Sequence, residues 1–243
     1  MNKEIYFKHI INKSIIVNSN NTPDDTLMFN RLLKLKQKGY YPDTILDIGA
    51  YHGIWTNNMK KIYNDSKFYL FEAINYDELN RFLNTDINVY NVLLNDKIEN
   101  VNWYEMKNTG DSMFKEKTSA FINCNPIIRQ SIDLNTHILQ NNILQDSKNI
   151  FIKIDCQGAE IPILKGASNI LNKTDFIMLE IPFFGCYNEG VPNYLEHIIF
   201  MNNIGFIPYD ILENHYMNDF NIQIDILFIN KNHPFNKIVN EII

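Results

Sequence analysis

The segment "IFIKIDCQGAEIPILKGA", residues 150–167, begins as an apolar strand that carries two charged residues and then turns into a helix. Side chains alternate between the two faces of a strand, so Ile152 and Ile154 point to one face while Lys153 and Asp155 point to the other. Charged groups in a strand that is otherwise apolar enough to be buried need a partner or a ligand. This segment therefore raises the question of what the two charges contact.

Apolar segments that predict strands alternate with helical segments along much of the chain. The predicted strands are "TILDIG" (44–49), "KFYLFE" (67–72), "NVYNVLL" (88–94), "IFIKID" (150–155) and "FIMLEIPF" (176–183), followed by "GFIPYDIL" (205–212) and "IQIDILFI" (222–229). Alternation of this kind predicts an α/β fold with a mostly parallel sheet and helices on both faces. No helix separates the last two strands, so we expect them to pair as an antiparallel hairpin at one edge.

The region between residues 100 and 149 is less regular. It contains one further predicted strand, "NVNWYEM" (100–106), then the polar loop "KNTGDSM" (107–113) and a helix around "DLNTHILQNN" (133–142). No motif in this region indicates a substrate.

We expect an N-terminal arm and helix, residues 1–40, followed by one globular domain, residues 41–243. A single α/β domain commonly reaches this size, and no repeat or linker divides the chain. In "TPDDTLMFNRLLKLKQKG" Thr22 caps a predicted helix, Pro23 takes its first position and Gly39 closes its end.

Composition narrows the class of protein. With 45% apolar residues, 21% charged residues and a net charge of −6, the chain should be globular and should not bind nucleic acid. No apolar run is long enough for a signal peptide or a membrane span. The three cysteines fit neither a disulfide framework nor a metal site, so we expect a cytoplasmic protein.

Acids stand at the ends of three predicted strands. Ligands of open α/β sheets bind outside the carboxyl ends of the strands, which makes Asp47, Asp155 and Glu180 the first candidates for a site. Lys153 lies one pleat deeper than Asp155. We expect it to offset part of this negative charge, because carboxylates without a cation would raise one another's pKa.

A glycine turn follows the first strand in "DIGAYHG". Gly49 and Gly53 would let the backbone approach a ligand, and Glu72, 25 residues beyond Asp47, could accept hydrogen bonds from two ribose hydroxyls. These features predict a nucleoside pocket for either NAD or S-adenosylmethionine. The spacing is not G-x-G-x-x-G, and an aspartate beside the first glycine suits the cationic amino-acid end of S-adenosylmethionine better than a pyrophosphate.

With these motifs the sequence resembles the FkbM family of S-adenosylmethionine-dependent methyltransferases over roughly residues 43–230. The resemblance is carried by "ILDIGAYHGIWT", "LFEAINYDELNRF", "NTGDSM" and, most specifically, "IKIDCQGAEIPILKGA". It implies the class I methyltransferase fold, which is a Rossmann-like seven-stranded sheet with the final strand inserted antiparallel. It also implies O-methylation, often of a sugar hydroxyl.

The resemblance places further cofactor contacts at Ala50, Ala73 and Ser112. Two positions depart from the family pattern: Ala73 stands where a proline is common, and Tyr51 stands where an asparagine often follows the Gly-Ala pair. The motif therefore indicates where the cofactor pocket lies better than it indicates the shape of the pocket. Turn formation is the alternative role of Ser112.

The acceptor must lose a proton as it is methylated. Asp155 or Glu180 could take this proton as a base, or these acids could hold a divalent metal that lowers the pKa of the hydroxyl. Lys153 would act beside them, and His52 and His215 are further candidate bases by residue type.

Two other functions remain open at this point. One is a non-catalytic module that binds S-adenosylmethionine or a sugar, and the other is an NAD-dependent oxidoreductase, which the missing third glycine disfavours. The expected acceptor is a small molecule or a glycan, and Phe183, Phe184 and Tyr187 could form a wall of its pocket. The sequence gives no indication of the oligomeric state.

Overall fold

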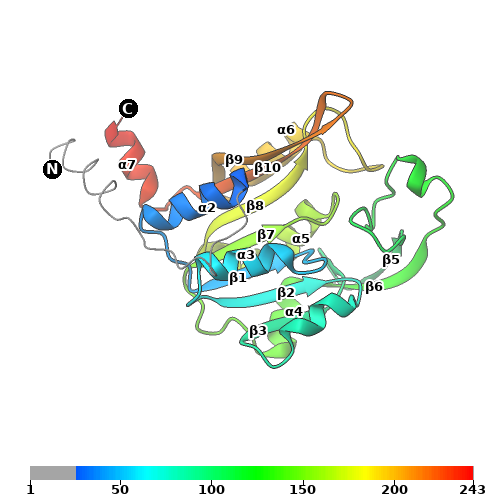
Figure 1. The fold of residues 1–243 in the computed structure, drawn as a ribbon, viewed down its shortest axis with the longest axis horizontal. Helices are drawn as coiled ribbons and strands as arrows, with labels where there is room; N and C mark the ends of the chain where they lie inside the picture. The colour runs from blue at the N-terminus through cyan, green and yellow to red at the C-terminus, as the bar shows by residue number, and fades with distance from the viewer. Residues whose placement is uncertain (1–25, 243) are drawn as a thin grey trace.

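The strand at residues 150–154 lies in the middle of a seven-stranded sheet (Figure 1). A computed structural model describes residues 26–242, with side chains up to residue 238. The strands of this sheet are β1 (Thr44–Ile48), β2 (Lys67–Glu72), β3 (Ile87–Asn91), β7 (Ile150–Ile154), β8 (Thr174–Pro182), β9 (Phe206–Met217) and β10 (Phe220–Asn230). Their order across the sheet is β3-β2-β1-β7-β8-β10-β9.

Strand directions match the expected methyltransferase arrangement. The pairs β2·β3, β1·β2, β1·β7 and β7·β8 are parallel, whereas β10 is antiparallel to both β8 and β9. The last strand is thus inserted between β8 and β9, and the predicted terminal hairpin is confirmed. The carboxyl ends of β1, β2, β7 and β8 consequently lie along one edge of the sheet.

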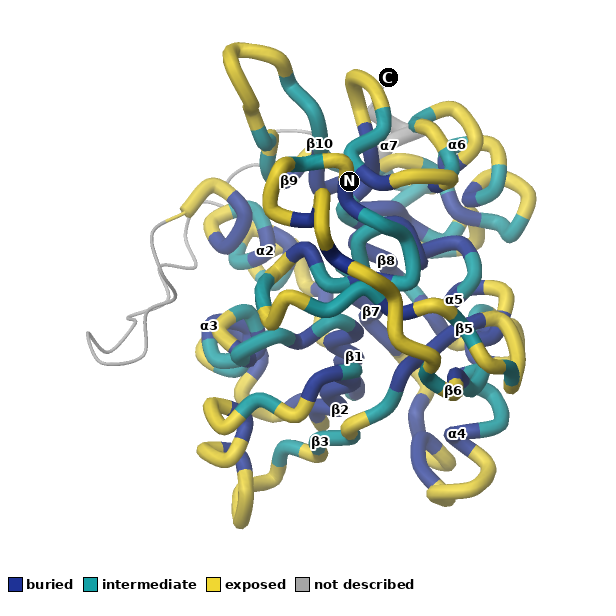
Figure 2. The backbone as a smooth tube through the Cα atoms, turned by 90° about the vertical axis from the view of Figure 1, so that its right-hand side faces the viewer, coloured by how far each residue is buried: buried dark blue, intermediate teal, exposed yellow. Residues whose placement is uncertain are grey.

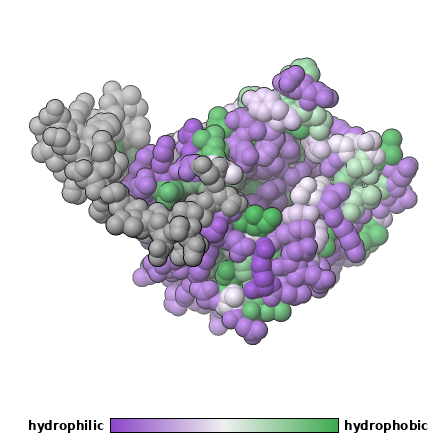
Figure 3. Space-filling model, in the orientation of Figure 1, coloured by the Kyte–Doolittle hydropathy of each residue, from purple (hydrophilic) through white to green (hydrophobic). Residues whose placement is uncertain are grey.

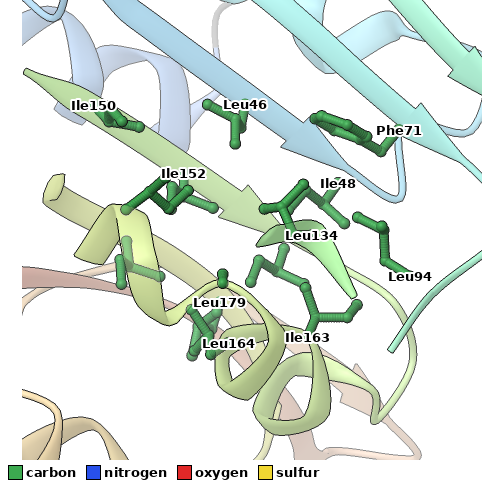
Figure 4. Close-up of a cluster of buried hydrophobic side chains, with 14 of the residues drawn as sticks. Leu46, Ile48, Phe71, Leu94, Leu134, Ile150, Ile152, Ile163, Leu164 and Leu179 are labelled. Atoms are coloured by element: carbon green, nitrogen blue, oxygen red, sulfur yellow. The ribbon is translucent and has the colours of Figure 1, made fainter. Parts of the chain in front are cut away.

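Helices cover both faces of the sheet. They are α2 (Leu27–Gln37) and α3 (Ile54–Ile62) on one face and α4 (Leu134–Asn141), α5 (Glu160–Gly166) and α6 (Tyr194–Asn203) on the other. Alternate residues of β7 point to opposite faces of the sheet. Ile152 lies in the same cluster of buried apolar residues as Leu134 and Leu164 (Figure 4), and Phe151 lies in a second cluster, which includes Leu32 of α2. The central strands are therefore buried on both sides, and the exposed backbone lies in the surrounding loops and helices (Figure 2).

A second, three-stranded sheet was not predicted as a unit. It consists of β4 (Leu94–Asn95), β5 (Glu99–Trp103) and β6 (Ile127–Asp133) in the order β4-β6-β5. The predicted strand 88–94 is split, because its first part forms β3 and its last residue begins β4. β6 escaped prediction because its residues are mostly exposed or half-buried, so they form no apolar run.

Two predicted helices begin or close differently in the structure. The first described residue of α2 is Leu27, and the side chain of Thr26 caps it by accepting a hydrogen bond from the Phe29 N–H. The predicted start, from Thr22 to Asp25, lies outside the described residues. The segment "YDELNRFLN" (76–84), whose pattern predicts a helix, forms the 3-10 helix η2 (Asp77–Phe82).

The remaining short elements are η3 (Ser119–Phe121), η4 (Ser168–Lys173), which continues α5, and α7 (Phe235–Ile242). Within the described part of the chain, no helix combines the length and the apolar character that crossing a membrane requires. The molecular face drawn in Figure 3 is mostly hydrophilic.

Candidate functional site

A cavity of about 360 Å³ opens at the carboxyl ends of β1, β2, β7 and β8. This volume lies within the range of small-molecule sites. Its roof is the polar loop 108–116, and its polar lining residues are Tyr51, Glu72, Tyr76, Asn108, Thr109, Asp111, Glu116, Asp155, Gln157, Glu180, Tyr187 and Gln223. The position agrees with the expectation that a ligand of this fold binds beyond the strand ends.

The residues predicted to bind the cofactor divide into two groups. Those that line the cavity are Gly49, Glu72, Ala73 and Asp155. Those that do not are Asp47, Ala50, Gly53 and Ser112. Among the residues predicted to be catalytic, Asp155 and Glu180 line the cavity, and Lys153 lies below its wall.

Glu72 is held in one orientation at the end of β2. One carboxylate oxygen, Oε2, accepts a hydrogen bond from the Tyr51 N–H at 2.7 Å, and Oε1 accepts one from the Ile74 N–H at 2.9 Å. Burial raises the pKa of Glu72, and these two hydrogen bonds oppose the rise. A carboxylate has about four lone-pair positions, so the fixed group can still accept hydrogen bonds from a diol.

The glycines of the first turn are required by contacts within the protein. A Cβ at Gly49 would lie 2.0 Å from the carbonyl oxygen of Asp155, and one at Gly53 would lie 2.4 Å from the ring of Phe82. Both glycines have positive φ, 74° and 69°, which an L-residue with a side chain rarely adopts. The expected close approach of a ligand is therefore not the reason for Gly53, which faces a side chain of η2.

Asp47 and Lys153 answer the question raised by the charged strand. They are direct neighbours in the register of β1 and β7, and the Lys153 Nζ lies 3.0 Å from Asp47 Oδ1. Asp47 is fully buried, and its other oxygen accepts a 2.6 Å hydrogen bond from the hydroxyl of Thr56 on α3. Within the described residues Asp47 thus has the surroundings of a structural ion-pair partner, on the face of the sheet that packs against α3.

Lys153 joins the ion pair to the glycine turn. Its Nζ also donates a 2.8 Å hydrogen bond to the Gly49 carbonyl and lies 3.6 Å from Asp155 Oδ2. Burial by itself lowers the pKa of Lys153, but the charges of Asp47 and Asp155 outweigh it and the net effect raises this pKa. Lys153 therefore stays charged and holds Asp155 at the cavity wall.

The two carboxylate oxygens of Glu180 have different surroundings. Its Oε2 accepts hydrogen bonds from the amides of Gln157, at 2.6 Å, and Gln223, at 3.2 Å, whereas Oε1 accepts no hydrogen bond from the described residues. Burial raises the pKa of Glu180 well above its usual value, and the charges of Asp155 and Asp225 raise it further. A carboxylate with these properties is a stronger base than a solvated one.

His215 and Asp225 lie behind Glu180 on the terminal hairpin. His215 Nε2 is 2.7 Å from Asp225 Oδ2 and 3.7 Å from Glu180 Oε1. The hydrogen bond to Asp225 raises the pKa of His215 despite its partial burial. One ligand atom from each of the three residues lies within 4.8 Å of the others, so this set is the one in the described chain that could hold a divalent metal.

Ser112 fastens the roof of the cavity to the strand ends. Its hydroxyl donates to the carbonyl of Gln157 at 2.9 Å and accepts from the Phe114 N–H at 3.1 Å, and the residue is buried. The flanking residues, Asp111 and Met113, line the cavity. Ser112 thus positions the loop rather than facing the cavity.

The predicted acceptor wall is only partly at the cavity. Tyr187 lines it, whereas Phe183 and Phe184 do not and are 47% and 65% exposed. His52 also lies outside the cavity, where its ring stacks on Tyr51 at 3.7 Å. His215 likewise does not line it.

Several lining residues were missed by sequence reasoning. Gln157 lies inside the motif at residues 150–167, directly after Asp155 and Cys156, and this position is a signal for a site residue. Gln223 shares a strand face with Asp225, two residues on, but a lone glutamine gives no signal. Trp103 and Glu116 belong to the irregular region, where no periodicity indicates which residues face inward.

Three solved methyltransferase structures have similar folds at low sequence identity. The methyltransferase FkbM from Methylobacillus flagellatus KT is 14% identical, covering 76% of this chain and 43% of that chain, with a TM-score of 0.46. The 1,6-didemethyltoxoflavin-N1-methyltransferase from Burkholderia thailandensis is 9% identical (86% and 80% covered, TM-score 0.46). Magnesium protoporphyrin IX methyltransferase from Synechocystis PCC 6803 is 5% identical (83% and 77% covered, TM-score 0.42).

The chain thus spans less than half the length of the Methylobacillus protein. No curated protein sequence matches it. The family model described as the methyltransferase FkbM domain matches residues 47–208, from the acid of β1 to the start of β9. This match covers well over half of the chain, which therefore belongs to the FkbM family of methyltransferases.

Proposed function

We propose that this protein uses S-adenosylmethionine to O-methylate a hydroxyl of a sugar, a glycan or another small molecule. The observation that carries the proposal is Glu72, an acid at the end of β2 whose two oxygens are fixed by backbone N–H groups at the wall of the cavity. Membership of the FkbM family supports methyl transfer as the reaction. Two of the three similar structures are methyltransferases for different substrates by name, and the third names no substrate, so they support no particular acceptor.

The residues of the cavity fit the proposed cofactor. Glu72 would accept hydrogen bonds from the two ribose hydroxyls, and the backbone at Gly49 and the side chain of Tyr51 would lie beside the rest of the nucleoside. Asp155 supplies a negative group for the cationic end of the molecule. When bound, the cofactor supplies an electrophilic methyl group on a sulfonium.

The protein would contribute alignment and a proton acceptor. We place the acceptor hydroxyl near Asp155 and Glu180, which line the same cavity as Glu72. Asp155 lies 3.6 Å from the charged Lys153 and accepts a hydrogen bond from Gln157. Glu180 Oε1 lies 3.7 Å from His215 and accepts no hydrogen bond from the described residues, and burial raises the pKa of Glu180, so Glu180 is the better placed of the two to take the proton. A divalent metal held by Glu180, His215 and Asp225 is the alternative way to lower the pKa of the hydroxyl.

A binding measurement tests the cofactor assignment. We expect calorimetric titration to detect S-adenosylmethionine and S-adenosylhomocysteine but not NAD, and Glu72→Ala to weaken binding by at least about tenfold, since a hydrogen bond to a charged group contributes roughly 1.5–3 kcal/mol. Glu78→Ala is the matched control, because Glu78 is a half-exposed acid of η2 outside the cavity. Equal affinity in Glu72→Ala and the parent, with both folded, would remove the ribose assignment.

The compartment is part of the same proposal. All three cysteines, Cys124, Cys156 and Cys186, are free thiols in the structure. Free thiols are the usual state in a reducing compartment, which supports a cytoplasmic location.

A further inference from the structure

The wall of the cavity carries charge of one sign only. Five acids line it, and they are Glu72, Asp111, Glu116, Asp155 and Glu180. Among the described residues, no lysine, arginine or histidine lines it. Three of the acids already accept hydrogen bonds within the protein. Glu72 and Asp111 accept them from backbone N–H groups, and Glu116 accepts one from the hydroxyl of Thr118.

Three cations that contact residues of the cavity region are bonded to other groups of the protein. Lys153 is 4% exposed and divides its charge between Asp47 and Asp155. Arg129 donates to the carbonyl of Ala73, and Lys117 donates to the carbonyl of Cys186 at 2.8 Å. An anion in the cavity would therefore meet no free cationic side chain on its walls.

The C-terminal part of the sheet, which supplies Glu180, also contains more acids than basic residues. From Thr174 to Asn230, which spans β8, α6, β9 and β10, the sequence contains no lysine or arginine. It contains eight acids, which are Asp175, Glu180, Glu189, Glu196, Asp210, Glu213, Asp219 and Asp225. Of these acids, Glu180 and Asp225 lie close together at the cavity end, whereas Asp175 lies at the opposite end of the sheet and Asp210 is paired with Arg31. A cleft with low-dielectric walls strengthens the field of charges such as Glu180.

Groups that bind neutral hydroxyls are present at the same place. Glu180 Oε1 accepts no hydrogen bond from the described residues, and Asp155 has only a 3.4 Å hydrogen bond from Gln157 and a 3.6 Å ion pair with Lys153. The amides of Gln157 and Gln223 lie beside Glu180. Tyr187 adds an aromatic surface to this part of the wall. Carboxylates, amides and an aromatic ring can together satisfy an uncharged polyol, whereas a phosphate would be desolvated next to like charges, which costs several kcal/mol.

We propose that the site selects an acceptor that is uncharged or cationic and rejects the same alcohol when it carries a phosphate, as in a sugar phosphate or a nucleotide-activated sugar. This inference rests on the proposed methyltransferase function and narrows its substrate class. If the acceptor is a sugar, methylation follows the glycosyl transfer that releases the sugar from its nucleotide carrier.

The first test identifies the product. The protein is incubated with S-adenosylmethionine bearing a trideuterated methyl group and with a metabolite and glycolipid extract, and labelled products are assayed for phosphorus by mass spectrometry. Labelled products without phosphate support the proposal. A labelled product that carries a phosphate or a diphosphate overturns it.

The second test reads the charge of the cavity without an acceptor. Cys156 lines the cavity, and burial raises the pKa of its thiol, so the modification is run at alkaline pH, where the reactive thiolate is more populated. The relative rates for a cationic, a neutral and an anionic methanethiosulfonate reagent then report the local potential. Peptide mass mapping separates Cys156 from Cys124 and Cys186. We expect the ratio of the cationic to the anionic modification rate to be on the order of tenfold higher at Cys156 than at a free small-molecule thiol.

The double variant Asp155→Asn/Glu180→Gln should remove most of that preference, because it neutralises the two acids that line this part of the wall. A parent protein that shows no preference over the free thiol would overturn the charge assignment. If no product is labelled in the first test, the proposed methyl transfer fails, and the reagent rates still decide whether the cavity excludes anions.

Discussion

At the scale of single residues, the two charges of the segment 150–155 belong to different surroundings, one buried and one at the cavity. Lys153 and Asp47 face each other across β7 and β1 and are almost completely buried, whereas Asp155 and Glu180 reach the cavity. Removing one member of a buried ion pair leaves an unpaired charge, which costs more than replacing both members. The two pairs can therefore be distinguished by stability and by activity.

Lys153→Met should lower the free energy of unfolding by about 3–5 kcal/mol, because Asp47 would stay buried without its cation. Denaturant unfolding measures this, and the double variant Asp47→Leu/Lys153→Met is the control, since it removes both charges. We expect the double variant to lose clearly less than the sum of the two single losses. Additive losses would contradict the assigned ion pair.

Glu180 should impose a pH dependence on methyl transfer. A base must be deprotonated to act, and burial raises the pKa of Glu180 well above its usual value. We therefore expect kcat/KM to rise with pH in a range above the normal titration of glutamate and to level off at higher pH. Glu180→Gln should lower kcat by about 100-fold or more and abolish that rising limb, as a pH-rate series would show. An unchanged profile in the variant would assign the proton transfer elsewhere.

At the scale of elements, the turn between β1 and α3 is fixed by backbone contacts. The Gly49 N–H donates to the Phe71 carbonyl at 2.9 Å, and the Asp155 N–H donates to the Ile48 carbonyl at 3.1 Å. β1 is therefore tied at its end to both β2 and β7. The strands and this turn were predictable because apolar runs, acids and glycines recur at defined spacings.

Gly49→Ala should be severely destabilising. Its Cβ would lie 2.0 Å from the Asp155 carbonyl oxygen at a positive φ, so both strain and a backbone displacement contribute. Gly205→Ala is the matched control, because Gly205 also has a positive φ, 91°, but no atom within 4 Å of the added Cβ. We expect Gly205→Ala to lose roughly 1 kcal/mol and Gly49→Ala clearly more, together with cofactor affinity, in unfolding and titration experiments. Similar losses in the two variants would show that the close contact has no effect.

The roof of the cavity could not be predicted at this scale. Its loop is held by Ser112 and by an isolated bridge between Glu116 and Asn188, which joins segments about seventy residues apart. Such contacts depend on tertiary structure and leave no periodicity in the sequence. The same holds for β6, whose exposed residues give no strand signal.

At the scale of the whole molecule, acids gather at both ends of the sheet. Asp155 and Glu180 lie at the cavity end, whereas Asp43 and Asp175 lie at the opposite end, where β1 and β8 begin. Burial, together with the charge of Asp43, raises the pKa of Asp175 from 3.8 to about 6. The folded protein thus binds this proton more tightly than the unfolded chain, so stability is lost as the pH rises through this interval.

Asp175→Asn should therefore stabilise the protein at neutral pH. The full shift corresponds to about 3 kcal/mol, and partial exposure of the side chain reduces the expected gain to about 1 kcal/mol at about pH 7.5. Near pH 4 the gain should vanish, since the parent residue is then protonated in the folded state. Urea unfolding at both pH values measures the difference, and cofactor affinity should not change. A gain at both pH values would contradict the titration of Asp175 as its source.

The position of the candidate site was predictable from the sequence, but the role of each residue in it was not. Acids at strand ends placed the cavity correctly, and Glu72, Asp155 and Glu180 all reach it. Asp47 was expected at the cofactor because the motif gives residue identity and spacing, whereas the direction of its side chain depends on Lys153 and Thr56 from elements distant in sequence. Gln223 came from a strand that pairs with β8 only in the folded sheet.

The contact between Gly49 and the Asp155 carbonyl has a mechanical consequence. It joins the turn after β1 to the end of β7 through main-chain atoms alone, with no rotatable side chain in between. Under the proposed function, the distance between the cofactor and its acceptor would therefore be set by the main chain of two adjacent strands. Rearrangement of side chains would then change which acceptor fits without changing that distance.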